Sequence, residues 1–176
     1  IGVMVTFIDD EGYLSFDGIG GWDHQVFVGQ RVLLMGRAGP VTGVIGKRAI
    51  HLMEKDERDK VSKASDLWLD IGALNRAEAE ARIRIGDPGV LASTVLEFPN
   101  GRIVSRSLDN RIGAFVVLEA LRLLSKKKPS ASVTAVATTR EEIGYTGGGA
   151  RTPATQSGAQ VGSGVDANPK LTPLKD

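Results

Sequence analysis

The stretch Ser107-Leu108-Asp109-Asn110-Arg111 leads directly into an apolar segment, and we expect this junction to organise the fold. The apolar segment, residues 112–124, has the composition of a helix that is buried on more than one side. Residues 132–138 come next, and their small and β-branched side chains, none of them charged, predict a central strand of a covered sheet. The strand runs into residues 139–144, TREEIG. This order predicts an α/β fold in which a sheet is covered by helices.

Three carboxylates are expected at one edge of that sheet. Asp109 precedes the helix, and Glu141 and Glu142 follow the strand, at the end of a sheet where ligands of α/β proteins bind. Taken singly, Asp109 is equally typical of a helix N-cap, and a Glu-Glu pair is typical of a solvated loop. Together the three acids favour a cation site, because neighbouring carboxylates repel unless a cation or proton lies between them. A pair of hard divalent ions would suit such ligands.

The first part of the chain has the pattern of a small β-rich domain. Residues 1–16 predict a hairpin around the turn Asp9-Asp10-Glu11-Gly12, and residues 28–46 predict further short strands between glycine and proline breaks. So many short strands in so few residues predict a small barrel or sandwich.

The end of this domain is expected near Phe98. Residues 67–72 predict another strand, and Asn75 has the position of an N-cap for a short helix over residues 76–82. A strand over residues 90–98 would complete the domain before the tight turn that follows it.

Composition sets limits on the class of protein. The 176 residues carry a formal net charge of +1, which gives no reason to expect a nucleic-acid or membrane partner. There are no cysteines, so disulfides and thiolate metal sites are excluded, as suits a cytoplasmic protein. No apolar run approaches the ~20 residues of a membrane span, and no signal peptide is visible.

The motifs resemble those of the tetrahedral metallo-aminopeptidases, also called glutamyl or deblocking aminopeptidases, some of which carry an endoglucanase name. The matching stretches are residues 107–111, residues 139–144 and the glycine-rich residues 147–150. The resemblance extends from Ile1 to about Thr155. It implies a peptidase-type domain, present in part, whose mixed sheet is covered by helices, with a small barrel-like or PDZ-like domain inserted into it.

The resemblance also implies an organisation of domains and subunits. Residues 1–98 would be the inserted β-rich domain through which subunits dimerise, and residues 99–176 would be part of the catalytic domain. The expected assembly is a homo-oligomer built from dimers, up to a dodecamer. We expect Trp22 and Phe27 to be exposed apolar residues that contribute to a subunit contact.

The resemblance further implies a set of roles for the acids. Asp109 would bridge two divalent metal ions (zinc, cobalt or manganese), Glu141 would be the general base, and Glu142 would be a ligand of one metal. Asp166, in the sequence Gly-Val-Asp, is the nearest match to a further aspartate ligand of the family. The residues before it, 160–164, contain two glycines and make a poor strand.

The sequence departs from the family in its histidines. The family carries a His-Met-Asp-Glu motif directly before the segment that matches Ile1, and another ligand histidine beyond the segment that matches residue 176. The two histidines here, His24 and His51, lie at neither place. We therefore expect an internal fragment of a longer protein, with little activity alone. The composition of residues 156–176 predicts a loop, whereas the family has a helix and a strand there.

Three functions fit these observations. The favoured one is a dinuclear metal-dependent aminopeptidase that releases N-terminal residues from peptides. The second is a non-enzymatic oligomerisation or peptide-binding module formed by residues 1–98. The third is a glycoside hydrolase, which is disfavoured because Glu141 and Glu142 are adjacent and cannot easily flank a sugar bond from opposite faces.

Overall fold

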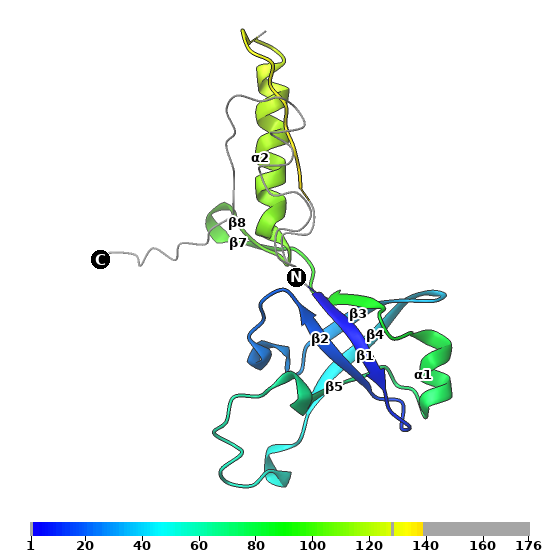
Figure 1. The fold of residues 1–176 in the computed structure, drawn as a ribbon. Coiled ribbons are helices and arrows are strands. Elements are labelled where there is room, and N and C mark those ends of the chain that lie inside the picture. The colour runs from blue at the N-terminus through cyan, green and yellow to red at the C-terminus, as the bar shows by residue number, and fades with distance from the viewer. Residues whose placement is uncertain (1, 128, 139–176) are drawn as a thin grey trace, which may run out of the picture. The chain divides into compact units, whose positions relative to one another are not determined.

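The structure is a computed structural model that describes residues 2–127 and 129–138. The chain divides into two compact units, one over Ile1–Thr94 and one that begins at Val95. The first unit is built mainly from β-strands. The described part of the second unit consists of a small hairpin, one long helix and an extended segment (Figure 1).

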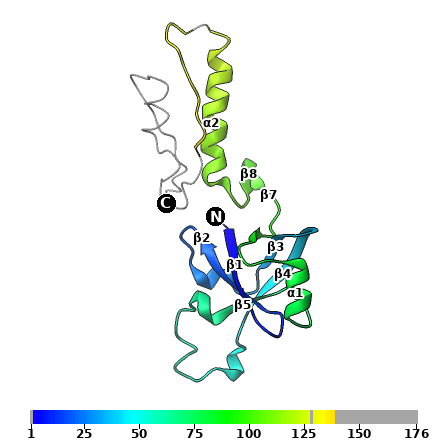
Figure 2. The same ribbon diagram turned by 45° about the vertical axis from the view of Figure 1, so that its right-hand side comes forward.

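Six strands of the first unit close into a barrel. The order around the barrel is β1, β2, β5, β4, β3 and β6, and β6 pairs with β1 to complete the ring. Figures 1 and 2 show this barrel from two sides. The strands are β1 (Gly2–Ile8), β2 (Leu14–Ile19), β3 (Arg31–Gly36), β4 (Gly39–Lys47), β5 (Leu67–Asp70) and β6 (Pro88–Leu91). The prediction of a small barrel or sandwich is confirmed as a barrel, whose closure removes the open sheet edges.

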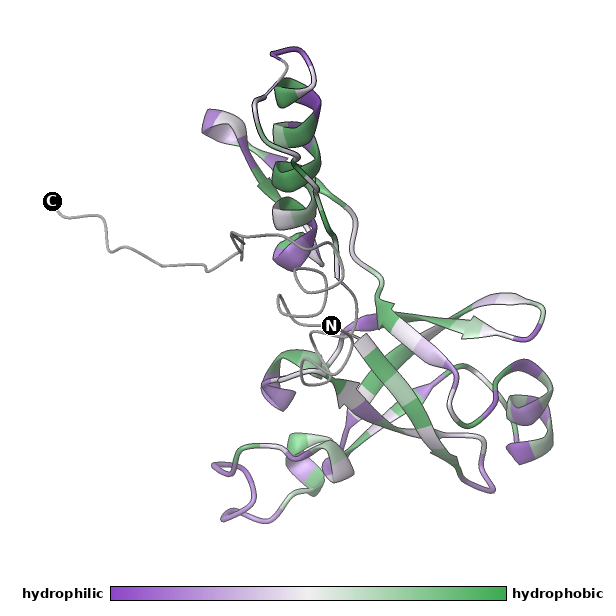
Figure 3. Cartoon of the chain, turned by 45° about the horizontal axis from the view of Figure 1, so that its top comes forward, coloured by the Kyte–Doolittle hydropathy of each residue, from purple (hydrophilic) through white to green (hydrophobic). Residues whose placement is uncertain are grey.

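Strand β1 shows how alternating side chains produce an inside and an outside. Val3 and Val5 are buried in the barrel, whereas Met4 and Phe7 are 40% and 48% exposed. A bulge between Val5 and Phe7 shifts the register with β2, and the extra residue turns Ile8 back toward the core. Figure 3 shows the resulting alternation of hydrophobic and hydrophilic residues along the barrel strands.

Phe27 lies at the centre of the core, although its sequence neighbours are typical of a loop. It belongs to the 3-10 helix η1 (His24–Phe27) and is 0% exposed. Its ring centre lies 5.5 Å from that of Phe16 and 4.5 Å from that of Trp22, which is partly buried. The Trp22 indole N–H donates to the carbonyl of Gly2 at 3.0 Å. The expectation that Trp22 and Phe27 are exposed contact residues is therefore wrong, because they pack on each other and on the core.

The rest of the core comes from every strand of the barrel. The other buried apolar side chains are Val3, Val5, Ile8, Leu14, Phe16, Val32, Leu34, Ile45, Leu67, Leu69, Ile71, Ala79 and Ile83.

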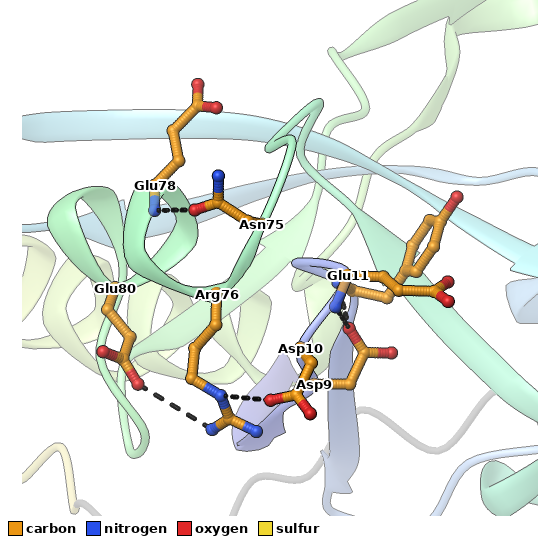
Figure 4. A network of polar contacts seen from close by, with 8 residues as sticks. Asp9, Asp10, Glu11, Asn75, Arg76, Glu78 and Glu80 are labelled. Atoms are coloured by element: carbon orange, nitrogen blue, oxygen red, sulfur yellow. Dashed lines mark hydrogen bonds and ion pairs between the residues drawn. The ribbon is translucent and has the colours of Figure 1, made fainter.

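Helix α1 (Arg76–Arg82) lies beside the barrel and begins at the expected cap. The Asn75 side chain accepts a hydrogen bond from the Glu78 backbone N–H at 3.0 Å, which satisfies one of the free amides of the first turn. Arg76 Nε lies 3.0 Å from Asp10 Oδ1, so the helix is tied to the β1–β2 turn (Figure 4). This ion pair is solvent-exposed, so it contributes at most about 1 kcal/mol to stability.

The connection from β4 to β5 contains only short 3-10 helices. These are η2 (Ile50–Leu52) and η3 (Ala64–Asp66). Local polar contacts hold the turns between them, including the ion pair of Lys60 Nζ with Asp56 Oδ2 at 3.1 Å.

The second unit begins with a hairpin instead of the end of one long strand. The prediction of one strand over residues 90–98 is wrong. Strand β6 ends at Leu91, which pairs with Val32 near the start of its partner strand β3. A separate strand, β7 (Leu96–Phe98), pairs with β8 (Arg102–Val104). The turn between them, η4 (Pro99–Gly101), has positive φ at Asn100 (65°) and Gly101 (67°), where glycine and asparagine are tolerated best.

Helix α2 (Leu108–Leu124) contains the predicted helical segment but is not buried on more than one side. Gly113 is its only buried residue, and Phe115 is 63% exposed. The predicted strand over residues 132–138 is also absent from the described part of the chain. A strand needs a neighbour for its backbone hydrogen bonds, and no other described residue provides one. The described residues therefore do not form the covered α/β sheet that the sequence predicts.

Candidate functional site

The hairpin and helix of the second unit position Asp109. Strand β8 ends at Val104, and the chain turns into α2 through Ser107, which has left-handed backbone angles (φ 61°, ψ 26°). Asp109 and Asn110 follow with non-helical angles, and the peptide bond between them is cis. Asp109 is exposed. The carboxylate thus stands at the very start of the helix, on a backbone that has not yet become helical.

Asn110, and not Asp109, caps the helix. The Asn110 Oδ1 accepts a hydrogen bond from the Gly113 backbone N–H at 2.7 Å. Residue 113 must be small, because a Cβ there would overlap with the Asn110 side chain. The interpretation of Asp109 as an ordinary N-cap is therefore wrong. Its carboxylate is left available for another partner.

Arg122 and Glu119 form an ion pair further along the same helix. Arg122 Nε donates to Glu119 Oε2 at 2.6 Å. This hydrogen bond lowers the pKa of Glu119 and raises that of Arg122, and the slight burial of each group acts in the opposite direction. The pair is solvent-exposed and belongs to the surface of α2.

The predicted site residues are only partly within the described structure. Asp109 is described, whereas Glu141, Glu142 and Asp166 lie outside the described residues. Within residues 2–127 and 129–138, no three His, Cys, Asp or Glu side chains gather in a way that could hold a metal ion. The structure therefore gives the setting of one candidate ligand, and the grouping of the acids stays a prediction.

Asn110 is the residue that sequence reasoning missed. Aspartate and asparagine are both good N-caps, so the adjacent pair left the choice open. The available signal was the glycine at position 113, because a residue without a Cβ leaves room for the Asn110 side chain. In the described part of the chain, no helix is long and apolar enough to cross a membrane.

Comparison with known proteins defines the class. The family model for the M42 glutamyl aminopeptidases matches residues 1–173. The lysyl aminopeptidase of Pyrococcus furiosus is 34% identical over 169 residues, which are 94% of this chain and 47% of that protein.

Two solved structures are also similar. The TET aminopeptidase of a marine-sediment thaumarchaeon superposes with a TM-score of 0.82 at 39% identity, over 91% of this chain and 46% of that one. The TET1 peptidase of Pyrococcus horikoshii, described as assembling into a tetrahedron or a large octahedral shell, superposes with a TM-score of 0.73 at 32% identity. This match covers 83% of this chain and 44% of that one.

Solved peptidase structures thus share the fold of most of this chain. The chain belongs to the M42 glutamyl aminopeptidase family. It spans less than half the length of each of these three relatives.

Proposed function

We propose that this chain contributes to a dinuclear metal-dependent aminopeptidase, which releases N-terminal residues from peptides. The observation that carries the proposal is the family match over residues 1–173, together with the names of the similar proteins, which are aminopeptidases. In this view residues 1–98 are the inserted β-rich domain and residues 99–176 are part of the catalytic domain.

Asp109 suits the role of a bridging metal ligand. Its carboxylate is exposed, and Asn110 performs the capping that would otherwise occupy it. Carboxylate oxygens are ligands for hard and borderline divalent ions, here zinc, cobalt or manganese. Such a pair of ions, when bound, would supply Lewis-acid polarisation of the scissile carbonyl and of a water molecule.

Glu141, Glu142 and Asp166 take their proposed roles from the family motif. Glu142 and Asp166 would complete the carboxylate ligands around Asp109. Glu141 would act as the general base, taking a proton from the attacking water and delivering it to the leaving amine. This role requires Glu141 to remain ionised before the reaction, which neighbouring cations favour.

The experiment that tests this mechanism is the substitution Glu141→Gln in an aminopeptidase of family length that carries this chain. Turnover of an aminoacyl-anilide should fall by at least about a hundredfold with metal content unchanged, since general-base catalysis contributes roughly 10²–10⁴. Glu57→Gln, in the connection between β4 and β5, is the matched control and should keep turnover. Near-normal turnover of the Glu141 variant would exclude it as the base.

We also propose a homo-oligomer in which the barrel contributes a subunit contact. The Pyrococcus horikoshii relative is described as forming closed shells. Since Trp22 and Phe27 belong to the core, the contact must use other apolar residues, of which Met35 is 69% and Ile50 is 67% exposed. Sedimentation of the chain should show a dimer or larger species, and Met35→Asp with Ile50→Asp should weaken it. A monomer at high micromolar concentration would contradict the proposal.

The alternatives are less well supported. A purely non-enzymatic module predicts no turnover in the family-length protein, which the same assay measures. A glycoside hydrolase predicts cleavage of glycosidic bonds that does not require an amino-terminal peptide substrate. The family match supports peptide substrates. A cytoplasmic location suits a chain without cysteine, and the net charge of +1 favours neither a nucleic-acid nor a membrane partner.

A further inference from the structure

Both described α-helices begin at an asparagine cap, and the two caps differ at the residue that they bind. At α1, the Asn75 side chain accepts from the Glu78 backbone N–H at 3.0 Å, and Glu78 carries a full side chain. At α2, the Asn110 side chain accepts from the Gly113 backbone N–H at 2.7 Å, and a Cβ at position 113 would overlap with it. The asparagine of α2 therefore lies closer to its helix than the asparagine of α1.

Gly113 is an unfavourable residue for a helix. Glycine lowers helix stability relative to alanine, because it loses more backbone freedom on folding. A cap does not itself require glycine three residues on, since the common capping box places glutamate or glutamine there. Gly113 is buried, and the three atoms that a Cβ would meet first all belong to the Asn110 side chain. The glycine thus makes room for Asn110 at the expense of the helix.

The turn before Asp109 is also held in a costly conformation. Ser107 has left-handed backbone angles (φ 61°, ψ 26°), which residues other than glycine rarely adopt. Such residues gather at functional sites, where the surrounding structure holds them in place. Asp109 therefore lies between a strained residue two positions before it and a tight cap at the next residue.

The anchoring of Asn110 restricts the place of the Asp109 carboxylate. The peptide group between the two residues is planar, so only ψ of Asp109 and φ of Asn110 can turn between their Cα atoms. While Asn110 is bonded to Gly113, Asp109 keeps non-helical backbone angles (φ −88°, ψ 112°) directly before the helix. Loss of the bond would free both torsions and spread the carboxylate over several positions.

We infer that Asn110 and Gly113 act together as positioning residues for Asp109 and hold its carboxylate in one place before a metal ion binds. The inference rests on the proposed function, in which Asp109 is the bridging metal ligand. Loss of a group that orients a metal ligand typically weakens metal binding by about 10–100-fold. The physical reason is that the ligand must then be ordered at the moment of binding.

The test is zinc affinity in an aminopeptidase of family length that carries this chain. Affinity is measured by calorimetric titration, separately from turnover. Asn110→Ala should weaken zinc binding by about 10–100-fold. Asn110→Ser keeps an uncharged capping oxygen and should restore most of the affinity. Asn75→Ala removes the cap of α1 in the barrel, so it is the matched control and should leave zinc affinity unchanged.

Gly113→Ala separates positioning from helix stability. Alanine favours a helix, so a role in helix stability alone predicts slower hydrogen exchange of α2 and unchanged zinc affinity. The positioning role predicts weaker zinc binding, because the new Cβ displaces the Asn110 side chain. In the Asn110→Ala background this overlap is absent, so Gly113→Ala should cause no further loss of affinity.

The outcomes distinguish the inference from the proposed function. Wild-type zinc affinity in either the Asn110→Ala or the Gly113→Ala variant would overturn the inference and leave the proposed function intact. An equal loss in Asn75→Ala and Asn110→Ala would also overturn the inference, because it would show a general effect of lost helix caps. A wild-type protein that neither binds zinc nor cleaves an aminoacyl-anilide would overturn the proposed function, and the inference with it.

Discussion

Replacing Phe27 with alanine should be among the most destabilising single changes in the barrel. The side chain is 0% exposed, and its ring contacts Phe16 and Trp22 with centre distances of 5.5 and 4.5 Å. Loss of the buried apolar surface accounts for about 1.5–3 kcal/mol. Each lost aromatic pair adds roughly 0.5–1.5 kcal/mol, and incomplete collapse of the cavity adds more.

The expected loss of unfolding free energy is therefore about 3–5 kcal/mol, the range typical of Phe→Ala in cores. For a domain of this size it corresponds to a fall in Tm of more than about 10 °C. Urea unfolding measures the change, followed by far-UV circular dichroism and by tryptophan fluorescence, which reports on Trp22 beside the cavity.

Val26→Ala is the matched control. Val26 precedes Phe27 in η1 and is 48% exposed, so its truncation should cost less than about 0.5 kcal/mol. A loss below about 1 kcal/mol for Phe27→Ala would refute the placement of this ring in the core. It would also restore Phe27 as a candidate for the subunit contact.

Three further predictions concern the second unit and its acids. Asn110→Ala should destabilise α2 by about 0.5–2 kcal/mol and speed its hydrogen exchange, whereas Asn110→Asp should retain the cap. Equal rates of hydrogen exchange in the two variants would contradict the capping role of Asn110. The hydrogen bond from Arg122 lowers the folded-state pKa of Glu119 below its ordinary value of 4.5. The pair therefore stabilises the helix above pH 4.5, and this contribution is lost as the pH falls through the lowered pKa. Glu119→Gln should remove this acid-dependent part of the helical signal, and an unchanged profile would show that the pair contributes nothing. Calorimetric titration of the 176-residue chain with zinc should give only weak binding, because the described residues hold no group of three potential ligands around Asp109. Tight binding of two ions would show that other residues of the chain complete the site.

Local sequence was sufficient for elements whose signals are short in range. The turn at residues 9–12 predicted the first hairpin, which is present as β1 and β2. Asn75 likewise predicted the start of α1, because a cap depends only on the next three amides. The family motif around Asp109 led to the family to which the chain belongs.

Other features depended on contacts between distant parts of the chain. Phe27 is buried because η1 brings it onto Phe16 of β2, and the composition of residues 24–27 gives no sign of this. The strand over residues 90–98 divides because β3, its partner, begins opposite Leu91. Neither result can be obtained from a periodic pattern, since each depends on which strands become neighbours.

The candidate site likewise combines features set by local sequence with features set by tertiary contacts. Sequence alone determined that an aspartate precedes an apolar helix and that two glutamates follow an uncharged segment. Only the tertiary structure decided that Asn110 caps the helix and leaves Asp109 exposed, because that choice depends on backbone angles fixed by the turn at Ser107. It also decided how far the described residues cover α2, where Gly113 is buried and Phe115 is 63% exposed, because an apolar pattern does not determine which surfaces become neighbours.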